Sequence, residues 1–148
     1  MRKFARRQVS SGSPLELQIG FCRAVRIGPL IAIAGTAPLA SNGTTVCPGD
    51  VYGQTKRCLE IMRRAIRAAG GRTDQVIRTR IMLTDITRWR DAGRAHGEMF
   101  DAIRPACTFV QVVRFIDPAW LVETEADVCL EQHRPLRVGS IVRFKFSR

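Results

Sequence analysis

A long amphipathic segment occupies the middle of the chain, from Val51 to Gly71. Its apolar side chains recur every three or four residues, while arginines and a lysine occupy other positions, a period typical of a helix that lies on a core. Asp50 is a candidate N-cap, and the pair Gly70-Gly71 predicts the end of the helix. The residues predicted to face the core are Val51, Thr55, Cys58, Leu59, Met62, Ile66 and Ala69. Such a helix needs an apolar layer to cover.

Strand patterns before this helix predict part of that layer. Residues 19–25 alternate weakly between apolar and polar until Gly28-Pro29 interrupts them. The run LIAIAGTAPL, residues 30–39, is typical of a buried strand that ends in a Gly-Thr bend. Pro38 then stops further pairing, because it has no backbone donor. We therefore expect two neighbouring strands ahead of the helix.

Three further strands and a second helix are predicted after it. Residues 75–85 form a strand whose predicted inner face is Ile77, Thr79, Ile81 and Leu83. Thr87 is a candidate cap for a second helix that runs toward Ile103. Extended segments follow at 104–113 and 121–131. The latter alternates cleanly, with acidic residues outward and an inner row of Val122, Thr124, Ala126, Val128 and Leu130.

This order of elements predicts an α+β protein with a mixed β-sheet and two helices on one face. We expect a single domain over residues 1–148, with a basic N-terminal segment at 1–14. Residues 132–148 form a basic C-terminal extension, predicted as an extra strand or a tail. The sheet face without helices favours self-association, because an apolar layer needs cover on both sides.

The net charge of +11 lies mostly at the two ends. The first seven residues include four basic residues, residues 134–148 include five, and neither stretch has an acid. The body is nearly neutral. Such tails predict at most non-specific contact with nucleic acid, and solubility is the favoured interpretation.

Five cysteines without a CxxC pair predict free thiols and a cytoplasmic protein. No apolar run approaches the roughly 20 residues that span a bilayer, so we expect no membrane association. The chain has no phosphate-binding glycine loop, no dinucleotide fingerprint and no metal-ligand spacing. We therefore expect neither a metal nor a cofactor.

Four segments together resemble the RidA/YjgF family of small trimeric proteins. They are IAIAGTAPL, DVYGQTKRCLEIMRRAIRAAGGRTDQVIRTRIMLTDI, RPACTFVQVVRF and LVETEADV. The resemblance covers roughly residues 15 to 130, in order and without large gaps. It implies a chorismate-mutase-like protomer and a homotrimer with small-molecule clefts between subunits. Family members of known chemistry hydrolyse reactive imines and enamines to ketones and ammonia.

The resemblance also implies the residues of the cleft. Gly35 matches the family's bend glycine, and Glu123 matches a glutamate that positions or activates the attacking water. Phe21 stands where the family has a tyrosine, so the ring remains without its hydroxyl. Cys107 replaces the arginine that pairs with a substrate carboxylate. Because a thiol offers one weak donor and no charge, we expect a substrate other than free amino-acid imines.

Alternatives remain open for the function and for single residues. Cys107 is a pocket-lining residue in the favoured interpretation, and a nucleophile or a redox-sensing thiol in the others. Glu123 without the family match belongs to a solvated row. His96 is expected as a half-buried histidine at a subunit contact. The candidate functions are an imine or enamine deaminase, a non-catalytic binding trimer and, least favoured, an RNA-binding protein or ribonuclease.

Overall fold

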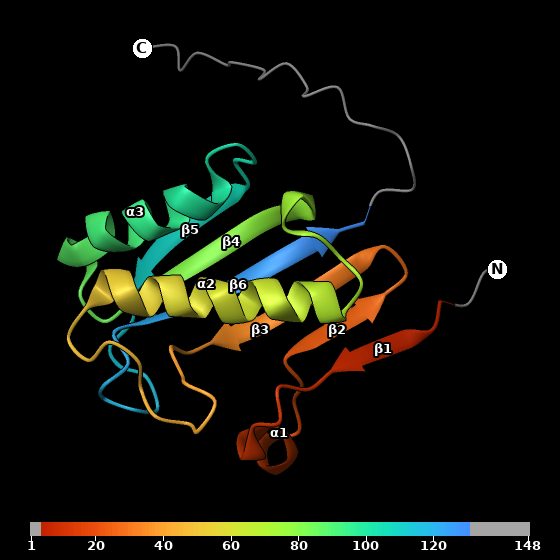
Figure 1. The fold of residues 1–148 in the computed structure, drawn as a ribbon, viewed down its shortest axis with the longest axis horizontal. Helices are drawn as coiled ribbons and strands as arrows, with labels where there is room; N and C mark the ends of the chain where they lie inside the picture. Colours follow the sequence, from red (N-terminus) through yellow and green to blue (C-terminus); the bar gives the residue numbers. More distant parts are fainter. Residues whose placement is uncertain (1–3, 131–148) are drawn as a thin grey trace.

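The computed structural model describes residues 4–130, in which two helices lie on one face of a six-stranded sheet (Figure 1). The chain order of the elements is β1 (Arg6–Val9), α1 (Pro14–Ile19), β2 (Ala24–Ile27), β3 (Leu30–Thr36), α2 (Val51–Ala68), η1 (Thr73–Gln75), β4 (Val76–Leu83), η2 (Ile86–Arg88), α3 (Trp89–Phe100), β5 (Ala106–Gln111) and β6 (Val122–Cys129). The residues 132–148 of the predicted extension lie outside the described part.

The strands lie in the order β1-β2-β3-β6-β4-β5. All neighbours are antiparallel except β4 and β5, which are parallel and are connected through α3. The last strand, β6, therefore lies inside the sheet, between β3 and β4. The predicted α+β architecture, with a mixed sheet and two helices on one face, is confirmed.

The helix α2 covers the sheet with the predicted stripe. Every residue predicted to face the core is buried, and Cys58, Met62, Ile66 and Ala69 have no exposed surface. The inner row of β6 packs beneath this helix. Burying one such aliphatic side chain typically contributes about 1.5–3 kcal/mol. Burial of this stripe fixes which face of β6 points away from the helices.

The strand predicted over residues 19–25 is wrong. Residues Pro14–Ile19 form the short helix α1, in which Ser13 is the N-cap and Pro14 occupies the first turn. Gly20, with φ 84°, ends this helix in the left-handed conformation. β2 begins only at Ala24. A helix of six residues is too short for its period to show in the sequence.

Two smaller predictions, for Ile77 and Thr87, also need correction, whereas the predicted N-cap residue of the long helix is confirmed. Ile77 is 52% exposed, because the register between β4 and β6 shifts at this residue and turns Val76 inward instead. Thr87 caps no helix; Asp85 accepts its backbone N–H at the start of η2, which leads into α3. Asp50 has the N-cap position of α2, but its side chain makes no capping hydrogen bond.

No helix among residues 4–130 is long and apolar enough to cross a membrane. This follows from the composition of α2, whose solvent side carries a series of charged residues.

Candidate functional site

Glu123 lies on the sheet face that the helices leave open. The alternation of β6 buries Val122 and Thr124 against the helix side, so Glu123 and Glu125 project the other way. Arg80 on β4 pairs with Glu125 at 3.1 Å and with Asp127 at 3.6 Å. Within residues 4–130, Glu123 has neither an ion pair nor a hydrogen bond. It is the one acid of this row whose carboxylate has no partner in the described part.

Gly35 makes room for the Glu123 carboxylate. The register between β3 and β6 shifts between Ile33 and Thr36, so β3 carries one extra residue there. A Cβ on Gly35 would lie 3.0 Å from Oε2 of Glu123. A side chain at this bulge would therefore push against the carboxylate. The structure thus brings together two of the residues singled out in the sequence.

Arg23 is the residue of this site that the sequence did not single out. It directly precedes β2, and its Nη1 donates to the Gly35 carbonyl oxygen and, at 3.2 Å, to Oγ1 of Thr36. Its guanidinium lies 5.6 Å from the ring centroid of Phe21. Its Nε is buried without a partner among the described residues. Arg23 therefore connects Phe21, the bulge and the surroundings of Glu123.

A second carboxylate approaches Arg23 from α1. Glu16 is only 5% exposed and accepts hydrogen bonds from both hydroxyls of Ser10 and Ser11 and from the backbone N–H of Ser11. Burial alone would raise the pKa of Glu16. These hydrogen bonds and the positive charge of Arg23 nevertheless hold its pKa below the ordinary value, so Glu16 is ionised near neutral pH.

The environment of Glu123 suits a base more than a surface acid. Burial raises the pKa of the Glu123 carboxyl, the Arg23 guanidinium opposes this rise, and the negative charge of Glu125 adds to it. Burial lowers the pKa of Arg23, against the effect of Glu16 and Glu123. A raised pKa makes a carboxylate a stronger acceptor of a proton from water.

Cys107 does not join this group within one protomer. It is exposed on the edge strand β5 and is in register with Thr79 on β4. Thr79 faces the helices and lies 2.8 Å from His96 Nε2 through its hydroxyl, so Cys107 belongs to the helix side of the sheet. Glu123 is two strands away and on the opposite face. Burial lowers the pKa of His96, which favours a neutral ring.

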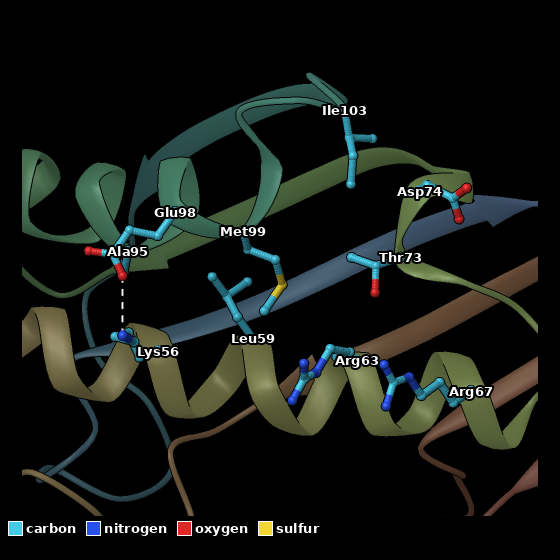
Figure 2. Close-up of a pocket in the computed structure, with 10 residues that line it drawn as sticks. All are labelled: Lys56, Leu59, Arg63, Arg67, Thr73, Asp74, Ala95, Glu98, Met99 and Ile103. Atoms are coloured by element: carbon cyan, nitrogen blue, oxygen red, sulfur yellow. Dashed lines mark ion pairs between the residues drawn. The ribbon is translucent and has the colours of Figure 1, made fainter.

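A separate groove lies on the outer side of the two helices (Figure 2). Its volume is about 590 Å³, and Leu59 and Met99 meet between α2 and α3 within it. Arg63 and Arg67 lie one turn apart along its edge, and Lys56 pairs with Glu98 at 3.1 Å. This groove is separated from Glu123 by the sheet. No group of three or more potential metal-ligating side chains occurs among residues 4–130.

Comparisons with known proteins show a family and several solved structures that are similar to this chain. The family described as Endoribonuclease L-PSP matches residues 14–130. An uncharacterized protein of Streptomyces coelicolor is 39% identical over 127 residues, which cover 86% of this chain and 94% of that protein. A solved Mycobacterium tuberculosis protein, described as a member of the highly conserved YjgF/YER057c/UK114 family, has a TM-score of 0.78 and 42% identity, covering 85% of this chain and 100% of that one. E. coli TdcF with bound serine has the same fold, with a TM-score of 0.69 and 21% identity over 88% of this chain and 100% of that one.

Proposed function

The chain belongs to the endoribonuclease L-PSP family, also called the YjgF/RidA family, and from this premise we propose that it is a small-molecule hydrolase. Its substrate is an imine or enamine without a free carboxylate, and its reaction yields a carbonyl compound and ammonia. The observation that carries this proposal is the half-buried Glu123 carboxylate, whose pKa is raised and which has no partner among the described residues.

In the proposed reaction, Glu123 orients a water molecule and takes one of its protons. The hydroxide oxygen attacks the carbon of a protonated imine and forms a carbinolamine. Glu123 then returns the proton to nitrogen, takes up the hydroxyl proton as the carbon–nitrogen bond breaks and the carbonyl forms, and passes that proton to the departing ammonia. One protonated imine and one water give one carbonyl compound and one ammonium ion. General acid–base assistance of this kind typically contributes about 10²–10⁴-fold in rate.

The charges around Glu123 support a substrate without a carboxylate. The chain has Cys107 where relatives carry the substrate-binding arginine, and a lost charge-assisted pair costs about 2–5 kcal/mol of affinity. Arg23 already donates to the Gly35 carbonyl and interacts electrostatically with two acids, Glu16 and Glu123. Among residues 4–130, an incoming carboxylate would therefore meet Glu123 beside a cation that is already engaged.

We propose a homotrimer that completes the cleft. No helix within residues 4–130 covers the sheet face around Glu123, and exposed apolar side chains such as Leu30 and Val110 flank its charged centre. A second copy is also the means by which Cys107, on a far edge strand, could approach Glu123. Light scattering coupled to size-exclusion chromatography tests this assembly, and a monomer at micromolar concentration would contradict it.

The second candidate function is binding without catalysis. The loss of the tyrosine hydroxyl at Phe21 and of the arginine at Cys107 favours it, and the structural relative TdcF holds serine. The basic tails alone support nucleic-acid binding. The two leading candidates differ in one measurement, the turnover of an imine.

The test compares two imines made in situ, one from a simple primary amine by an amine oxidase and one from leucine by an amino-acid oxidase. Semicarbazide traps the imine, so a hydrolase lowers the initial rate of semicarbazone formation. We expect this effect with the carboxylate-free imine, and we expect Glu123→Gln to remove it. No effect with either imine would leave binding as the function.

A further inference from the structure

We infer that Arg23 is a positioning residue that holds the bulge of β3 and, through it, the Glu123 carboxylate. Its catalytic consequence rests on the proposed function, whereas its coupling to Glu123 does not. Arg23 reaches the site from the segment between α1 and β2 and touches the bulge beside Glu123 rather than Glu123 itself. It therefore acts through the protein and not on the substrate.

Arg23 stabilises the bulge in β3. A bulge leaves one residue of the strand without its partner in the ladder. Nη1 of Arg23 donates to the Gly35 carbonyl and to the Thr36 hydroxyl, and the Arg23 carbonyl accepts the Ala34 N–H at 3.0 Å. The backbone and the side chain of Arg23 thus both stabilise the bulge. Because Gly35 borders Oε2 of Glu123, the position of the carboxylate depends on these bonds.

Arg23 also acts on Glu123 through its positive charge. The charged groups that act on Glu123 are Arg23, which directly precedes β2, and Glu125 on its own strand. The Cys58 thiol from α2 is in turn affected by the charge of Glu123. Burial raises the pKa of Cys58 well above its ordinary value, so this thiol is neutral. Arg80 on β4 pairs with Glu125 and moderates its effect. Arg23 is thus the cation of the described residues that acts directly on Glu123.

Glu16 also interacts with Arg23, because its negative charge acts to raise the pKa of the Arg23 guanidinium. The negative charges of Glu16 and Glu123 both act to raise the pKa of Arg23, and these three groups together carry one excess negative charge when Glu123 is ionised. This charge favours a protonated imine and disfavours a carboxylate. The cation that a carboxylate would need is engaged by the protein.

The experiment follows the carboxyl carbon of Glu123 by ¹³C NMR across pH in full-length protein, with Glu123→Gln to assign the resonance. We expect Arg23→Gln to raise the pKa of Glu123, because a nearby positive charge is lost. Glu16→Gln should shift it in the opposite direction. Arg26→Gln is the matched control, since Arg26 lies on β2 and donates to the carbonyls of Gly28 and Ala69, away from Glu123.

Arg23→Lys separates charge from geometry. A lysine keeps the charge but not the paired bonds to Gly35 and Thr36, so the titration should stay close to that of the native protein while kcat falls roughly tenfold at unchanged KM. If Arg23→Gln does not fold, the titration shift in Glu16→Gln and the fall of kcat in Arg23→Lys still decide. An unchanged titration in folded Arg23→Gln, or an equal shift in Arg26→Gln, would overturn the inference. A titration that shifts as expected in a protein without turnover would refute the proposed function alone.

Discussion

Replacing Gly35 with alanine tests whether the position of the Glu123 carboxylate matters for the rate. The new Cβ would lie 3.0 Å from Oε2, whereas ordinary contact between non-bonded atoms begins at about 3.5 Å. The carboxylate must therefore retreat by about 0.5 Å. Because a misplacement of about 1 Å can cost about a hundredfold in rate, we expect kcat/KM for a carboxylate-free imine to fall about tenfold.

The same substitution should leave the fold intact. Gly35 does not have a positive φ, so alanine fits its backbone. The close contact involves the end of a flexible side chain, and glycine-to-alanine changes of this kind stabilise by about 0.4–1 kcal/mol through the unfolded state. We therefore expect the free energy of unfolding to change by less than about 1 kcal/mol, measured by urea denaturation.

Two other glycines provide opposite controls. A Cβ on Gly71 would lie 2.9 Å from Cδ1 of Ile31 in the core, so Gly71→Ala should lose stability and keep activity per folded molecule. Gly97 in α3 has open space, so Gly97→Ala should keep the activity and raise the stability by up to about 1 kcal/mol, because alanine favours a helix more than glycine does. Full activity in folded Gly35→Ala would refute the reasoning, because the rate would then not depend on the position of the Glu123 carboxylate beside Gly35.

Three further predictions concern charge and packing. Since the pKa of Glu123 is raised in the folded protein, its ionisation destabilises the fold as pH rises past the ordinary glutamate value of about 4.3. Thermal unfolding should therefore show Glu123→Gln more stable than the native protein at pH 7, with the difference lost below about pH 4; an equal difference at both pH values would contradict this. Cys107→Arg should increase turnover of the leucine-derived imine by about tenfold or more if a second copy completes the cleft, while Thr108→Arg, the same charge on the other face of β5, should not. Met62→Ala should cost about 2–5 kcal/mol in urea denaturation, whereas Arg63→Ala on the exposed side should change stability by less than about 0.5 kcal/mol; similar losses in both would refute the core assignment of Met62.

The parts of the fold predicted correctly are those with a long repeating pattern. The stripe of α2 and the alternation of β6 extend over many residues, and burial on one side makes their period visible. The helix α1 and the strand β1 have too few residues to show one. Ile77 was misplaced because a register shift interrupts the alternation, and nothing in the local sequence marks it.

The site was predictable only in part for a different reason. Gly35, Phe21 and Glu123 were identified through a resemblance, and composition alone would leave Glu123 in a row of exposed acids. Arg23 looks like any surface cation in a chain with 24 basic residues. Its role depends on a bulge in another strand and on a buried carboxylate seven positions earlier. Such a role exists only after the strands are paired.

The place of β6 inside the sheet has a consequence for how the protein is made. The ribosome releases β3 and β4 well before β6, yet each of these strands pairs with β6 and not with the other. Until residues 122–129 emerge, both strands present a free hydrogen-bonding edge, which is the feature that leads nascent chains to aggregate. Insertion of this last segment between them completes the sheet and at the same moment delivers Glu123 to the bulge. A chain that ends before residue 122 therefore has neither a closed sheet nor a carboxylate at the bulge.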